Sequence, residues 1–262
     1  MNYTQYFQNC LMLKHSFLCV GIDPDPALIP DRFDRSPEGI YRFVTEVIQA
    51  TKDLTPAYKF NLAFFEYWGW KGWQVLERLL EEMPDDVLLV GDAKRGDIGN
   101  SSKFYAKALL ETLKFHAVTL SPYLGSESLQ PFLQDETKGA FILCVTSNPS
   151  GRELQDHGGD FPLYRKTAEI VEKLNQKQNA GLVMGATKPE MLVEMRNRFP
   201  NLPFLIPGVG TQGGEAATAV DVCRKCGAGL INVSRGILFP SGGQFPENVR
   251  SAAQLYHEQF QF

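Results

Sequence analysis

Eight short apolar runs, each followed by a longer segment with helical spacing, are the feature that most restricts the fold of this 262-residue chain. The runs have the length and the β-branched content of strands rather than of helices. They cover residues 17–22, 57–61, 87–92, 116–120, 141–145, 181–184, 203–206 and 229–233. Nearly continuous apolar strands are typical of a parallel sheet that is buried on both faces.

The segments between the runs predict helices. Residues 38–53, for example, place Ile40, Val44 and Val47 on one face. The other predicted helices cover 71–82, 101–113, 126–134, 163–178, 189–198, 213–225 and 246–260. Eight such pairs predict an α/β fold, a (β/α)8 TIM barrel of eight parallel strands. A short extra N-terminal helix over 3–14 would plug the barrel floor. An open doubly wound sheet is the alternative architecture.

Composition and charge exclude several classes of protein. The chain has 26 Lys and Arg against 30 Asp and Glu, a net charge of −4, which argues against nucleic acid as a partner. No apolar run approaches the roughly 18 residues that a membrane span needs, and the first residues lack the features of a secretory signal. The five cysteines are interpreted as reduced thiols of a cytoplasmic protein. No linker divides the chain, so we expect a single (β/α)8 barrel domain over residues 1–262.

The third run ends in charged residues. In the segment VLLVGDAKRGDI, Asp92 and Lys94 share a strand face with the apolar residues before them. A turn after this run could bring the Asp97 carboxylate back towards Lys94. Lys59 in the second run and Asp23 at the end of the first add two charges at the same rim of the barrel, where barrel enzymes place their chemistry.

An alternating set of opposite charges keeps all its members ionised. At about 4 Å and an effective dielectric near 20, each such contact is worth roughly 4 kcal/mol. A structural ion pair at a strand end is the alternative interpretation for Asp92 and Lys94 alone. The second carboxylate and the two further charges favour an active site instead, because unpaired buried charge is costly.

Two glycine-containing loops predict a phosphate site. PGVGTQGG at 207–214 follows the seventh strand and SRG at 234–236 follows the eighth, the usual place for a phosphate in such barrels. Gln212 can donate from its amide, the backbone at Gly236 can approach closely, and Arg235 can form a two-pronged contact. The loop also matches the GxGxxG pattern of dinucleotide-binding folds. That pattern requires an early βαβ unit and an acidic residue at the end of the next strand, and the sequence has neither here. A glycine-rich turn without a ligand is the other alternative.

Ser147 follows the fifth strand and could hydrogen-bond a heterocycle. It opens a segment, residues 147–162, that is long enough to act as a lid. An ordinary surface loop is the competing interpretation.

These motifs together resemble the orotidine 5′-phosphate decarboxylase family. DAKRGDI, PGVGTQGG and SRG, with Asp23 and Lys59 on the first two strands, occur in the expected order between residues 19 and 236. YKFNLAFFE and VTSNPSG are similar to segments of the second subfamily.

The resemblance implies a cofactor-free decarboxylation of orotidine 5′-monophosphate to uridine 5′-monophosphate in pyrimidine synthesis. By position, Lys94 would protonate C6 and Asp92 would lie beside the leaving carboxylate. Asp97 would reach the ribose of the neighbouring subunit's substrate, so the active unit would be a homodimer.

The resemblance also implies the binding residues. Asp23 and Lys59 would hold the ribose hydroxyls, and Ser147 the pyrimidine. Gln212, Arg235 and Gly236 would bind the phosphate. Ser101 would contribute to the partner-side contact. At that contact the chain has Gly99 and Ser101 where better-known members carry Pro and Thr. Its phosphate loop is also shorter than in many members, so closure of the site over the substrate is expected to rely on residues 147–162.

No cofactor and no metal are expected, so electrostatic stabilisation by Lys94 must replace an electron-sink cofactor. A magnesium-dependent sugar-phosphate decarboxylase or aldolase of the same superfamily is the alternative function. A phosphate-ligand sensor without turnover is a second alternative, from another class of protein.

Overall fold

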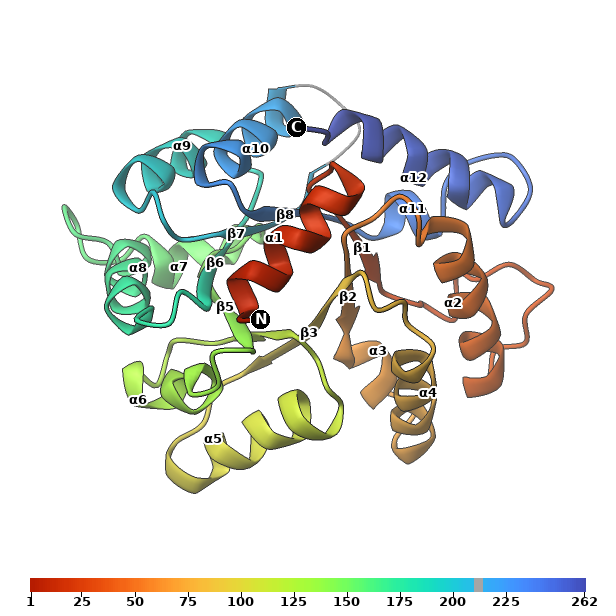
Figure 1. Cartoon of the computed structure of the whole chain (residues 1–262), viewed down its shortest axis with the longest axis horizontal. Helices are drawn as coiled ribbons and strands as arrows, with labels where there is room; N and C mark the ends of the chain where they lie inside the picture. Colours follow the sequence, from red (N-terminus) through yellow and green to blue (C-terminus); the bar gives the residue numbers. More distant parts are fainter. Residues whose placement is uncertain (210–213) are drawn as a thin grey trace.

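The strands close into one barrel in which every neighbouring pair is parallel (Figure 1). The computed structural model describes residues 1–209 and 214–262. The strands are β1 (Leu18–Ile22), β2 (Ala57–Asn61), β3 (Leu88–Arg95), β4 (Ala117–Leu120), β5 (Gly139–Val145), β6 (Ala180–Met184), β7 (Phe204–Pro207) and β8 (Gly229–Val233). The predicted (β/α)8 barrel is confirmed, and the open sheet is wrong because β1 pairs with β8.

The predicted helices surround the barrel and lie where the apolar spacing places them (Figure 1). They are α2 (Pro37–Thr51), α4 (Trp70–Glu81), α5 (Gly99–Ala106) continued by a π-helix (Lys107–Thr112), α6 (Ser126–Leu129) continued by a 3-10 helix (Gln130–Leu133), α8 (Leu163–Leu174), α9 (Pro189–Arg198), α10 (Gly214–Cys226) and α12 (Glu247–Gln259). In the part of the chain described, no helix is both long and apolar enough to cross a membrane.

Three short helices in the loops after β2, β5 and β8 were not predicted. They are α3 (Leu62–Glu66), α7 (Arg152–Gln155), which follows a 3-10 turn (Pro149–Gly151), and α11 (Arg235–Leu238). Segments this short contain no complete apolar repeat, so the periodicity of the sequence does not reveal them.

The predicted N-terminal helix is α1 (Tyr3–Lys14), which lies across the end of the barrel where the strands begin (Figure 1). The backbone N–H of Tyr3 donates to Glu136 O at 2.8 Å, just before β5. The ring of Phe7 meets Phe141 edge-on, with 6.4 Å between ring centroids. Gly139 leaves the space for the Tyr3 ring, because a Cβ there would stand 2.5 Å from that ring. The helix therefore closes the floor, as predicted.

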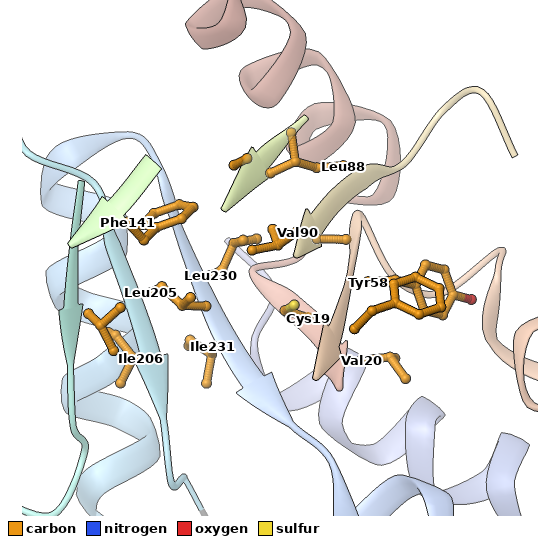
Figure 2. Close-up of a cluster of buried hydrophobic side chains, with 14 of the residues drawn as sticks. Cys19, Val20, Tyr58, Leu88, Val90, Phe141, Leu205, Ile206, Leu230 and Ile231 are labelled. Atoms are coloured by element: carbon orange, nitrogen blue, oxygen red, sulfur yellow. The ribbon is translucent and has the colours of Figure 1, made fainter. Parts of the chain in front are cut away.

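Alternate strand residues fill the barrel interior and the layer beneath the helices. Cys19, Val90 and Leu230 point toward one another inside the barrel, while Tyr58 points outward (Figure 2). The Tyr58 hydroxyl lies 2.7 Å from the hydroxyl of Thr51 on α2. This alternation determines which face of β3 carries the residues that follow Val90.

Candidate active site

Three charged side chains meet at the carboxyl end of β2 and β3. Lys59 Nζ donates to Asp92 Oδ2 at 2.7 Å, and Lys94 Nζ donates to Asp92 Oδ1, also at 2.7 Å. The side chains of Lys59 and Asp92 are only 6% and 9% exposed, whereas that of Lys94 is 50% exposed. The array is thus buried at one end and open to the mouth of the barrel at the other.

Both buried members of this array are held in their charged forms. Burial alone would raise the pKa of Asp92, but the ammonium groups of Lys59 and Lys94 outweigh it and hold that pKa well below its usual range. Burial lowers the pKa of Lys59, but the attraction of Asp92 and Asp23 outweighs it and the pKa is raised. Because Asp92 is ionised, a second anion placed beside it experiences repulsion, and Lys94 is the half-exposed cation that such an anion would meet.

The backbone of β3 departs from regular strand geometry where it carries these residues. Gly91 pairs with Val118 of β4 and Arg95 pairs with Leu120, so three residues of β3 stand opposite one residue of β4. Lys94 has a φ of 48°, a left-handed conformation that is unusual for a residue with a side chain. Strand alternation therefore accounts for the common face of Val90 and Asp92. The direction of the Lys94 side chain is set by the irregular backbone instead.

Asp23 lies just beyond β1, and its Oδ1 is buried without a hydrogen-bond partner. An unpaired buried carboxylate oxygen is costly, and a ligand hydroxyl would satisfy it. Asp97, in contrast, does not close the array within the chain. Its carboxylate accepts from the Ile98 N–H at 2.8 Å, and none of the ion pairs between described residues joins it to Lys94. Within a single subunit Asp97 therefore makes no ion pair with Lys94, and its role at the site stays a prediction.

Ser147 follows β5, at the same end of the barrel as the lysine array. Its side chain is exposed. A Cβ on Gly208, after β7, would stand 3.7 Å from Ser147 Cβ, and a Cβ on Gly185, after β6, would stand 2.9 Å from the Ser147 N atom. The loops after β5, β6 and β7 thus converge at this residue.

Of the predicted phosphate site, the structure describes the part after β8. Gln212 lies outside the described residues. Arg235 is exposed in the first turn of α11. Gly236 has a packing reason to be glycine, because a Cβ there would stand 2.6 Å from the Tyr256 hydroxyl oxygen.

Ser101 lies on α5 and is exposed. The first residue of this helix, Gly99, has a φ of 54°, which suits glycine. Large apolar side chains are exposed on this helix and near it, namely Ile98, Phe104, Tyr105, Tyr123 and Leu124.

Two residues of this end of the barrel were missed by the sequence analysis. Thr119 on β4 donates its hydroxyl to Asp92 Oδ1 at 2.8 Å and accepts from the Lys94 N–H at 3.0 Å. Asn232 on β8 is buried, and its Oδ1 has no hydrogen-bond partner. A polar residue inside an apolar run is the signal that could have identified both.

Within residues 1–209 and 214–262, no group of three or more His, Cys, Asp or Glu side chains is arranged to hold a metal ion. The donor set at the array is instead two ammonium groups around one carboxylate.

The closed barrel with an ionised array at the carboxyl ends of its strands defines the chain as a (β/α)8-barrel enzyme. Comparison with known proteins identifies the family. The model of the Orotidine 5'-phosphate decarboxylase / HUMPS family matches residues 16–241, and the chain belongs to this family.

Relatives and solved structures agree with this assignment. The chain is 43% identical over 260 residues to an orotidine 5'-phosphate decarboxylase of Herpetosiphon aurantiacus, covering 97% of this chain and 96% of the relative. It is 44% identical over 263 residues to the same-named protein of Roseiflexus castenholzii, covering 97% and 95%. The structure of the Leishmania donovani OMP decarboxylase matches with a TM-score of 0.86 and 34% identity, over 99% of this chain and 97% of that one.

Proposed function

We propose that this protein decarboxylates orotidine 5′-monophosphate to uridine 5′-monophosphate in de novo pyrimidine synthesis, without a cofactor. The observation that carries the proposal is the array Lys59–Asp92–Lys94. It offers a half-exposed ammonium at the barrel mouth, fixed 2.7 Å from a buried, ionised carboxylate. A substrate carboxylate seated there meets repulsion from Asp92, and the carbon it leaves meets the Lys94 cation.

The chemical step breaks the bond between C6 and the carboxyl carbon. Carbon dioxide leaves, and the electron pair of the bond stays on C6 in the plane of the ring, where the π system cannot delocalise it. The preorganised Lys94 ammonium stabilises this charge and then transfers a proton to C6. The neutral amine regains its proton from water, so the enzyme returns to its starting state.

The other residues bind the substrate. Asp23, with its unpaired Oδ1, and Lys59 hold the ribose hydroxyls. Ser147 bonds the pyrimidine. Gln212, Arg235 and the backbone at Gly236 bind the phosphate, and this remote binding energy favours closure over the reacting carbon.

We further propose that the active unit is a cytoplasmic homodimer of one-domain subunits, each spanning residues 1–262. Asp97 would then contact the substrate of the neighbouring subunit, with Ser101 beside it. The exposed apolar side chains on and around α5, which include Phe104 and Tyr105, support an interface on this face, because large exposed apolar patches mark contact surfaces.

One assay tests the reaction. Purified protein is mixed with orotidine 5′-monophosphate, and the loss of its ultraviolet absorbance is followed with and without a metal chelator. We expect turnover that the chelator leaves unchanged. Turnover that requires magnesium, or activity on a sugar phosphate alone, would support the alternative decarboxylase or aldolase. Tight binding of uridine 5′-monophosphate without turnover would support a sensor.

A further inference from the structure

Thr119 connects the two charged groups of β3 through one hydroxyl. This side chain is 1% exposed. Its proton goes to Asp92 Oδ1, at 2.8 Å, so its lone pair is free to accept the Lys94 N–H, at 3.0 Å. The polarity of both bonds is fixed, because an ionised carboxylate only accepts and a backbone N–H only donates.

The place of Thr119 in the sheet explains why these bonds are needed. It is the single β4 residue opposite residues 92–94 of β3. The regular ladder is interrupted there, so the Lys94 N–H has no strand carbonyl on that side. A buried N–H without an acceptor is costly, and the Thr119 hydroxyl replaces the missing one.

The Lys94 backbone also requires support. A φ of 48° is unfavourable for lysine and persists only where neighbouring contacts enforce it. Arg95 Nη1 donates to Ala93 O at 3.0 Å, before Lys94, and the Ser121 N–H donates to Arg95 O at 2.8 Å, after it. The bond to Thr119 holds Lys94 itself between these two.

We propose that Thr119 is a positioning residue that sets the direction of the Lys94 ammonium and the orientation of the Asp92 carboxylate at the same time. Its hydroxyl bonds Asp92 and Lys94, so its effect on the reaction passes through these two residues. The inference rests on the proposed function, and it deepens that function by adding a residue that acts through Lys94.

The decisive variant is Thr119→Val, which keeps the shape of the side chain and removes the hydroxyl. A hydrogen bond to a charged group and one to a backbone N–H are lost, so kcat should fall by about 10- to 100-fold. Thr119→Ser retains the hydroxyl, and kcat should stay within about threefold of the wild type, the remaining loss coming from its freer rotamers. KM and the affinity for uridine 5′-monophosphate should change by less than about twofold in both, because ground-state binding is untouched.

A matched control is available at the opposite end of the barrel. The buried Thr55 hydroxyl, before β2, lies 2.9 Å from Ala57 O and 3.1 Å from Leu18 O, and no hydrogen bond between described residues joins it to the array. Thr55→Val should lower the melting temperature and leave kcat at the wild-type value. A purely structural role for Thr119 would make its valine variant behave in the same way.

Crystal structures of the wild type and of Thr119→Val complete the test without substrate. In the variant we expect Lys94 to leave the left-handed region and its Nζ to move from Asp92. An unchanged Lys94 geometry, a wild-type kcat in Thr119→Val, or an equal loss in Thr119→Ser would each overturn the proposal. If the valine variant does not fold, Thr119→Ala provides the same comparison. Should the wild type fail to decarboxylate orotidine 5′-monophosphate, the proposed function fails, and the structures still decide the role of Thr119.

Discussion

Asp92 Oδ2 and Lys59 Nζ lie 2.7 Å apart, and both side chains are more than nine-tenths buried. Such a pair is costly to form and far more costly to break, because removing one partner leaves the other charge buried and uncompensated. The same Asp92 carboxylate bonds Lys94 through its second oxygen. The position of the proposed proton donor therefore depends on a structural ion pair beneath it.

The first prediction concerns that pair. Asp92→Asn should destabilise the fold by about 3–5 kcal/mol, because the Lys59 ammonium then loses its buried partner. The double variant Asp92→Asn with Lys59→Met should lose less stability than the two single variants together, because the buried Lys59 charge is removed along with its partner. Urea unfolding of the four proteins measures this coupling. Strict additivity would show that the pair does not interact in solution.

The second prediction concerns Lys94. Lys94→Ala should fold, because the side chain is half exposed, and should release no measurable carbon dioxide from orotidine 5′-monophosphate. Lys52→Ala, an exposed lysine just after α2, is the control and should retain full activity. The release of labelled carbon dioxide from carboxyl-labelled substrate gives the necessary sensitivity. Residual turnover near the wild-type rate in Lys94→Ala would remove Lys94 from the reaction.

The third prediction concerns the phosphate. Arg235→Ala should lower kcat/KM by about 10- to 150-fold, the value of one charge-assisted bond. The loss should exceed the fall in affinity for uridine 5′-monophosphate, because phosphate binding also drives closure. Arg250→Ala, which removes an ion pair with Asp53 on the outer face of α12, should leave kcat/KM unchanged. Intact activity in Arg235→Ala would contradict the phosphate assignment.

The fourth prediction concerns the dimer. Asp97→Ala and Lys94→Ala should each be inactive, yet a mixture that exchanges subunits should recover activity. Random pairing gives mixed dimers in half of the cases, each with one intact site, so about a quarter of the wild-type activity should return. Sedimentation confirms that mixed dimers form. No recovery in a mixture that does form them would show that Asp97 acts within its own subunit.

The fifth prediction concerns acid stability. Burial, with a smaller effect of Lys138, lowers the pKa of His116 to about 4. Its Nδ1 accepts from the Leu89 N–H at 2.9 Å, which requires the neutral ring. In this pH range His116 binds a proton more tightly in the unfolded chain than in the folded one. The free energy of unfolding should therefore fall by up to about 3 kcal/mol as the pH falls from 6.5 to about 4.

Thermal unfolding between these pH values checks this expectation. His116→Gln should lose stability at neutral pH and depend less on pH in this window. His157→Gln, at an exposed position, should follow the wild-type curve. Parallel pH dependence in all three proteins would rule out His116 as the cause.

The amino-acid sequence by itself determined the α/β architecture. Eight buried apolar runs alternating with amphipathic segments predict eight β/α pairs in a parallel sheet and the helix over 3–14, while the pairing of β1 with β8 decides for the closed barrel over an open sheet. Asp23, Lys59 and Asp92 could also be placed, because each lies in or at the end of a run whose direction the barrel specifies.

Only the tertiary structure decided how the charges meet. Strand alternation predicts that Lys94 shares the face of Asp92, but it cannot predict the left-handed backbone that aims Lys94 or the register shift against β4. No local pattern predicts that Thr119, 25 residues further along the chain, accepts a hydrogen bond from the Lys94 N–H. Hydrophobic periodicity is a property of neighbours in sequence, whereas the position of a charge depends on hydrogen bonds between strands, which exist only once the barrel has closed.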